Sequence, residues 1–128
     1  MIIHQIIFSP TGGTQRVSEI LCQGIGKESI VTDLCVKAAD IQLPDIQEDD
    51  LAVIAMPVFA GRVPALAVER LRMVKPNSVK CVVVAVFGNR AYDDALLEMQ
   101  DVASKIGFRV IAAVAAVAEH SIIRKYGK

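Results

Sequence analysis

A strand-like run, a turn of small residues and a helix-like segment open this sequence in that order, which limits the folds open to it. Residues 2–7 are mostly apolar, and apolar side chains recur at helical spacing from Val17 onward. The segment between them runs from Phe8 to Gln15 and is rich in small residues. A strand that enters a helix through a short glycine-containing loop is typical of parallel α/β proteins.

The composition of this loop indicates an anion-binding turn. Gly12 and Gly13 let the backbone approach a ligand closely, and the helix start offers free N–H groups and a favourable dipole. Ser9, Thr11 and Thr14 can add hydroxyl donors. The loop has no lysine or arginine, so neutral donors would hold a phosphate, unlike in a nucleoside-triphosphate P-loop. The plain alternative is an ordinary turn capped by Thr14.

The rest of the chain alternates between strand-like and helix-like segments. Strands are predicted at 2–8, 28–34, 51–56, 79–87 and 108–117, and helices at 14–26, 65–73 and 92–106. Residues 36–50 contain a proline and an acidic turn, so a helix in that crossover should be short or degraded. The pattern predicts an α/β fold with a doubly wound parallel sheet, in a single domain over residues 1–128.

Composition agrees with this fold class and argues against several functions. A hydrophobic content of 53% and a mean hydropathy of +0.45 suit a parallel sheet buried on both faces. Fourteen basic residues balance fourteen acidic ones, so no nucleic-acid footprint is expected. Apolar runs are too short to span a membrane and no signal sequence opens the chain, so no membrane role and a cytoplasmic location are expected.

Cysteine and histidine are too sparse to suggest a metal centre. Cys22, Cys35 and Cys81 are widely spaced, and no Cys-x-x-Cys pair occurs that would hold zinc or an iron–sulfur cluster. His4 and His120 have no ligand cluster near them in the sequence. We therefore expect surface histidines, or histidines with a satisfied partner, rather than metal ligands or catalytic groups.

Ser9-Pro10-Thr11-Gly12-Gly13-Thr14 resembles the phosphate-loop signature of the flavodoxin family, Ser/Thr-x-Thr-Gly-x-Thr. The resemblance covers most of the chain and implies a five-stranded sheet in the order 2-1-3-4-5, with FMN bound at its carboxyl edge. The tract 117–122 also resembles the flavodoxin portion of bacterial flavodoxin–ferredoxin fusion proteins, although these 128 residues include no cysteine-rich cluster domain. Only residues 122–128 remain for the last helix, which should be shortened or missing.

Two further loops would flank the flavin ring if the resemblance holds. It implies that Phe59 or a neighbour covers one ring face, and that the Gly61 peptide can turn to accept a hydrogen bond from flavin N5. Tyr92 matches the family's stacking tyrosine, and Gly88 and Asn89 would face the pyrimidine edge. The implied cofactor-binding set is Ser9, Thr11, Gly12, Gly13, Thr14, Pro57, Val58, Phe59, Ala60, Gly61, Phe87, Gly88, Asn89, Tyr92 and Asp93. Plain alternatives are a turn glycine at 61 and a packing tyrosine at 92.

The chain also departs from the family pattern. It has no tryptophan to stack on the ring, and its charge is balanced where many flavodoxins are acidic. Arg62 and Arg90 could offset charge on a reduced flavin or simply be solvated. The short end of the chain should leave part of one sheet face bare, so we expect a homodimer or docking of another subunit there.

These features favour an FMN-binding electron carrier rather than an enzyme with its own substrate. Its partner would be a redox protein, such as one of ferredoxin type. One alternative is an NAD(P)H-dependent flavin or quinone reductase on the same fold, and another is a binding module that has lost flavin. A signalling receiver domain does not fit, because Pro57 and Ser9-Pro10 stand where it requires acidic residues.

Overall fold

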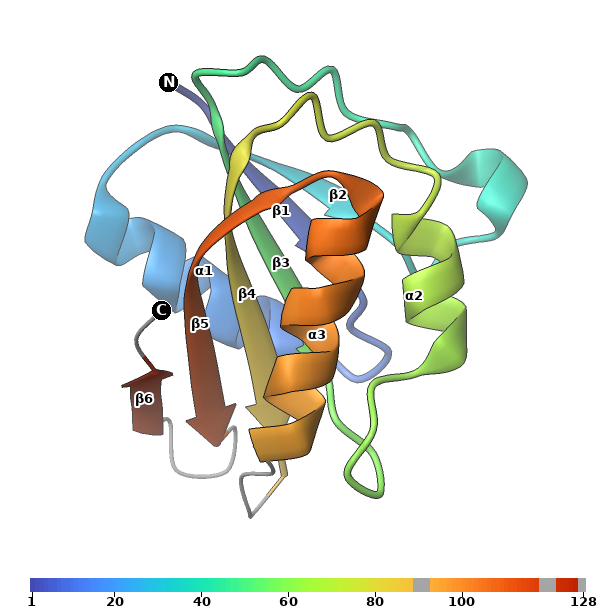
Figure 1. The fold of residues 1–128 in the computed structure, drawn as a ribbon, viewed down its shortest axis with the longest axis vertical. Helices are drawn as coiled ribbons and strands as arrows, with labels where there is room; N and C mark the ends of the chain where they lie inside the picture. Colours follow the sequence, from blue (N-terminus) through green and yellow to red (C-terminus); the bar gives the residue numbers. More distant parts are fainter. Residues whose placement is uncertain (89–92, 118–121, 127–128) are drawn as a thin grey trace.

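Six strands form one sheet with helices on both faces (Figure 1). The computed structural model describes residues 1–88, 93–117 and 122–126, the last of these as backbone. The strands are β1 (Ile3–Ile7), β2 (Ser29–Asp33), β3 (Leu51–Pro57), β4 (Lys80–Phe87), β5 (Arg109–Val117) and β6 (Ile122–Tyr126). The helices are α1 (Gly13–Ile25), α2 (Ala65–Leu71) and α3 (Asp93–Ile106), with a 3-10 turn at Ala38–Asp40.

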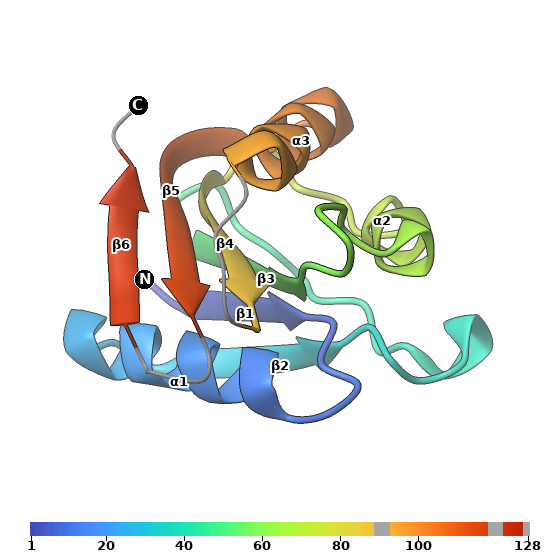
Figure 2. The same cartoon turned by 90° about the horizontal axis from the view of Figure 1, so that it is seen from below.

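The sheet order is β2-β1-β3-β4-β5-β6, and the first five strands in that order run parallel. This confirms the predicted doubly wound sheet in the order 2-1-3-4-5. Figure 2 shows α1 on one side of the sheet, with α2 and α3 on the other. Two buried clusters match these layers, one containing Val17 and Cys22 of α1, the other Leu71 of α2 and Met99 of α3.

Strand β4 shows why the central strands are apolar almost without interruption. Val83 and Ala85 belong to the cluster beneath α2 and α3, while Val84 and Val86 belong to the cluster facing α1. Both faces of the strand are covered, so neither set of alternating positions can carry polar groups. The same pattern makes the sheet recognisable from sequence.

The crossover between β2 and β3 contains no α-helix, where a short or degraded helix was predicted. Only the 3-10 turn at Ala38–Asp40 interrupts an otherwise extended chain. Leu34, Ile41 and Ile46 along this segment are buried in the cluster on the α2 and α3 side. These side chains cover the part of the sheet that a crossover helix would otherwise cover.

The last helix was predicted to be shortened or missing, and none occurs in the described residues after β5. Ile122–Tyr126 instead forms β6, antiparallel to β5, a strand that the sequence analysis did not predict. The pairing runs from Val117 opposite Ile122 to Ala113 opposite Tyr126. The outer edge of β5 would otherwise present unpaired backbone N–H and C=O groups, and β6 pairs with them.

The uncovered sheet face is smaller than predicted. Val84, Val114 and Ala116 belong to the cluster on the α1 side, and all are buried. At these positions the expectation of a bare face is wrong. Ile111, near the start of β5, is the large apolar side chain of this strand that remains exposed.

A buried polar pair lies at the start of β1 and β3. His4 Nε2 is 2.9 Å from Asp50 Oδ2, and both side chains are buried. The Asp50 carboxylate also accepts hydrogen bonds from the N–H groups of Gln47 and Ile2, each at 3.0 Å. His4 therefore has the partner that was expected at one nitrogen, while its buried Nδ1 has none among the described residues. Across the described ranges, no group of three metal-ligating side chains occurs.

Candidate functional site

The first two loops and the start of the third lie at one edge of the sheet because β1, β3 and β4 are parallel neighbours. Figure 1 shows the first two loops at the edge toward which the arrows of the parallel strands point. Backbone bonds continue past the strand ends, since the Phe8 N–H donates to Ala55 O at 3.1 Å and the Val58 N–H to Val86 O at 2.9 Å. The predicted juxtaposition of the first two loops with the start of the third follows from this topology.

The first loop presents a row of free backbone donors. Gly12 has φ of +90°, a left-handed conformation that glycine adopts without strain, and α1 begins at the next residue. Within the described part of the chain, the N–H groups of the four residues Thr11–Thr14 have no hydrogen-bond partner. Consecutive free N–H groups at a helix start form an anion-binding concavity.

The hydroxyl residues of this loop have different roles. Ser9 Oγ accepts a hydrogen bond from the Gln15 N–H at 3.0 Å, and the Ser9 N–H donates to Cys35 Sγ at 3.1 Å. Ser9, predicted as a ligand contact, thus shapes the loop through its N–H and one lone pair of Oγ, while its O–H proton can still be donated. Thr14 is 4% exposed, and its hydroxyl has no partner among the residues that the structure describes. The hydroxyl protons of Ser9 and Thr14 are therefore both available to an anion.

The second loop is a tight hairpin turn with an exposed aromatic residue. Phe59 and Arg62 exchange two backbone hydrogen bonds, at 2.9 and 3.0 Å, around Ala60 and Gly61. Ala60 has φ of +51° and Gly61 of +79°, and positive values at both central residues define a type I′ turn. Phe59 is 58% exposed, whereas Val58 before it is buried.

This turn changes the interpretation of Gly61. Turning the peptide between Ala60 and Gly61 while Ala60 keeps its positive φ would produce a type II′ turn. That turn requires glycine at its first central position, which Ala60 occupies here. Ala60 therefore opposes rotation of the peptide between Ala60 and Gly61, and the hydrogen bond to flavin N5 that the resemblance implies for Gly61 stays a prediction.

Arg62 is held by an ion pair from a different element. Its Nη2 lies 2.8 Å from Glu98 Oε2 on α3, and its Nε lies 3.3 Å from Oε1. The Val63 N–H also donates to Glu98 Oε1, at 3.3 Å. The hydrogen bond from Arg62 is the main cause that lowers the pKa of Glu98. The prediction named charge compensation or solvation for Arg62 and missed this partner, since an acidic residue on an exposed helix face is an ordinary pattern.

The third loop is described at its two ends only. The side chain of Phe87 is buried in the core, so its backbone is the part that a ligand at this edge could contact, and its predicted role stays a prediction. Gly88 is exposed, and the space where a side chain would stand is open, with no atom within 4 Å of the Cβ position. Asp93 begins α3. Asn89, Arg90 and Tyr92 lie outside the described residues, so their predicted roles stay predictions.

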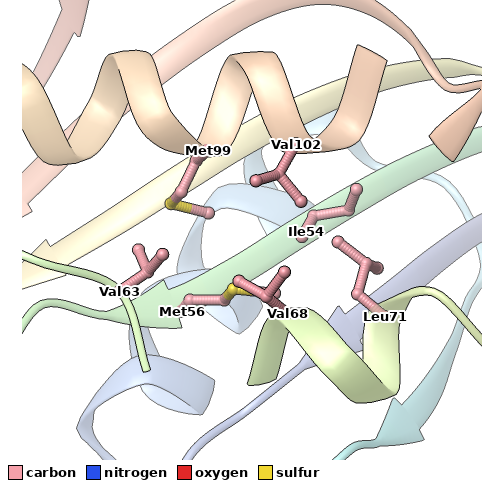
Figure 3. A pocket seen from close by; sticks show the side chains of 7 residues that line it. All are labelled: Ile54, Met56, Val63, Val68, Leu71, Met99 and Val102. Atoms are coloured by element: carbon pink, nitrogen blue, oxygen red, sulfur yellow. The ribbon is translucent and has the colours of Figure 1, made fainter. Parts of the chain in front are cut away.

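An apolar pocket near the second loop is part of the core packing. Figure 3 shows side chains of β3, α2 and α3 pointing toward one another, together with Val63. They close on a space too narrow for a water molecule, and they carry no polar group. The lining residues are Ile54, Met56, Val63, Val68, Leu71, Met99 and Val102. The pocket anchors the end of the second loop and is not a ligand site.

Solved structures resemble this chain throughout its length. A flavodoxin of Streptococcus pneumoniae has a TM-score of 0.65 and 20% identity, over 91% of this chain and 84% of that protein. A flavoprotein of Lactobacillus acidophilus in complex with FMN has a TM-score of 0.64 and 18% identity, over 89% and 90%. A WrbA-like protein of Agrobacterium tumefaciens has a TM-score of 0.68 and 13% identity, over 92% and 83%.

The chain has the flavodoxin-like fold. Comparison with family profiles and with curated sequences finds no match, so the likeness is one of structure. In the flavodoxin-like fold, ligands bind where the strand order reverses, beyond the carboxyl ends of β1 and β3. The first two loops described above follow these two strands. No helix in the described residues is long and apolar enough to cross a membrane.

Proposed function

We propose that this chain binds FMN and carries electrons between redox proteins. The observation that carries the proposal is the row of four unpartnered N–H groups from Thr11 to Thr14 at the start of α1. Phosphate oxygens are the acceptors that such a turn binds. One solved protein of the same fold is a flavoprotein in complex with FMN, which supports a flavin as the attached group.

The residues at this edge suit both parts of FMN. The first loop offers N–H donors and the Thr14 hydroxyl, and the dipole of α1 favours the negative charge. In the neighbouring loop, Phe59 leaves more than half of its side chain in water. A flat heterocycle stacked on Phe59 would remove that apolar surface from water, which is favourable at roughly 25 cal/mol per Å².

Bound FMN would supply the redox chemistry, so no acid, base or nucleophile of the chain is required. Phe59 would shield one ring face from water, and Val58, buried beneath the turn, would keep that loop in place. In the third loop, Tyr92 is proposed to stack on the ring, Gly88 and Asn89 to face its pyrimidine edge, and Asp93 to belong to the same site. The phosphate and the ring would thus be held by separate loops.

Comparison of FMN with riboflavin tests this division. Titration of the flavin-free protein, followed by quenching of flavin fluorescence, should give a dissociation constant at least about tenfold lower for FMN, because hydrogen bonds to a charged group contribute about 1.5–3 kcal/mol. Thr14→Val should lose about tenfold in FMN affinity and leave riboflavin unaffected. Thr32→Val, which alters a β2 residue that is only 3% exposed, is the matched control and should change neither.

Equal affinity for FMN and riboflavin would contradict the phosphate site. If the protein binds neither flavin, the whole proposal is wrong and a binding module without flavin is supported instead. The FMN-loaded protein should keep its yellow absorbance when NADH or NADPH is added alone. Rapid bleaching under those conditions would instead support a reductase. Reduction and reoxidation by an added ferredoxin-type protein is the result expected of a carrier.

Self-association remains a separate proposal. The exposed Ile111 of β5 lies on the part of the sheet where a second copy or another subunit could dock. Sedimentation over a range of protein concentrations tests it. A stable monomer at high concentration would contradict it.

A further inference from the structure

Glu98 connects α3 to the turn that carries Phe59. Its carboxylate accepts three hydrogen bonds from two consecutive residues, two from the Arg62 side chain and one from the Val63 N–H. The donors lie 36 and 35 positions earlier in the chain. The contact therefore joins two elements that are distant in sequence, at the point where the turn ends.

The turn depends on such support because it has little packing of its own. Phe59, Ala60 and Arg62 are exposed, and Ala60 adopts a left-handed conformation that strains a residue with a side chain. On its entry side, the Val58 N–H is bonded to Val86 O of β4. On its exit side, Glu98 makes the polar contacts, just before Val63 enters the core.

A second ion pair on the same helix provides a contrast. Asp101 Oδ2 lies 3.0 Å from Lys105 Nζ, within one helical turn of α3. Both side chains are exposed and neither contacts another element through this pair. Asp101 thus resembles Glu98 in charge, helix and type of partner, but lacks the connection to the second loop.

We propose that Glu98 is a positioning residue for flavin binding: it holds the Phe59–Arg62 turn against α3 and thereby sets where Phe59 meets the ring. The inference rests on the proposed binding of FMN. Glu98 makes no contact with the first loop among the interactions of the described residues. Its loss should therefore weaken FMN and riboflavin by the same factor, in contrast to loss of the Thr14 hydroxyl.

Trypsin provides a measurement that needs no flavin, because the bond between Arg62 and Val63 lies at this contact. Native-state cleavage there requires the turn to open, so its rate reports how firmly the turn is held. In the flavin-free protein, Glu98→Ala should speed cleavage at Arg62–Val63 about tenfold, measured by mass spectrometry. Glu98→Gln keeps an oxygen for the Val63 N–H but loses the charge, so its cleavage rate should lie between those of the wild type and Glu98→Ala. Asp101→Ala should be cleaved at the wild-type rate.

Flavin titration of the same variants completes the test. Glu98→Ala should lower the affinities for FMN and for riboflavin equally, by about tenfold, and Asp101→Ala should lower neither affinity. Unchanged cleavage in folded Glu98→Ala would overturn the proposal, as would a loss confined to FMN. If Glu98→Ala does not fold, as urea unfolding would reveal, Glu98→Gln decides by the same two criteria. If the wild type binds no flavin, the proposed function fails, while the cleavage rates still decide whether Glu98 holds the turn.

Discussion

Replacing Asp50 by asparagine should destabilise the protein at neutral pH and have little effect in strong acid. The Asp50 side chain is 7% exposed and accepts hydrogen bonds from the N–H groups of Gln47 and Ile2 and from His4 Nε2. Asparagine has the same shape, but its amide nitrogen would face one of these donors and it carries no charge. The substitution therefore removes the ionised carboxylate without leaving a cavity.

The size of the effect follows from the pKa of Asp50. The hydrogen bond from the Gln47 N–H, aided by those from His4 and Ile2, outweighs burial and lowers this pKa from 3.8 to about 2. At about 1.36 kcal/mol per pKa unit, the ionised form adds about 2 kcal/mol to the free energy of unfolding. Because the folded-state pKa is the lower one, this stability is present above about pH 4 and is lost as the pH falls toward about 2.

Urea unfolding at a series of pH values measures this directly. Asp50→Asn should be about 2 kcal/mol less stable than the wild type at pH 7, and the difference should close as the pH approaches about 2. The matched control is Asp49→Asn, because Asp49 is an exposed neighbour with the same charge, and it should change stability by less than about 0.5 kcal/mol. A difference that persists unchanged at low pH, or an equal effect in both variants, would refute the reasoning.

Two further predictions concern the hairpin turn and the thiols. In urea unfolding, Ala60→Gly should stabilise the flavin-free protein by about 1 kcal/mol, and Gly61→Ala should destabilise it. The reason is that both positions have positive φ, which glycine adopts without strain and alanine does not. If neither effect is seen, the turn has another conformation in solution. Iodoacetamide should label half-buried Cys35 in the native protein, while Cys22 and Cys81 react only on unfolding, since both are buried and burial raises the pKa of Cys81 to about 12. Peptide mass mapping that shows equal labelling of all three would contradict this.

Periodicity along the chain was sufficient to predict the parallel sheet and its three helices. Buried strands such as β4 must be apolar on both faces, and α1 and α3 must carry apolar side chains at helical spacing, so local sequence contains this information. The first loop could be found for the same reason, since its two glycines, its hydroxyl residues and its place before α1 are all visible in the sequence. Its identity as an FMN site remains a proposal.

Contacts between distant residues were decided by the tertiary structure alone. His4 and Asp50 are 46 positions apart, and Arg62 and Glu98 are 36 apart, and each is an unremarkable residue in its own segment. Residues 122–126 pair with the outer edge of β5, a contact that their own sequence did not predict. Local side-chain preferences thus determined the five parallel strands and the three helices. Strand β6 and the choice of partners were decided by the folded sheet, because hydrogen bonds and ion pairs form only between groups that the fold brings within reach.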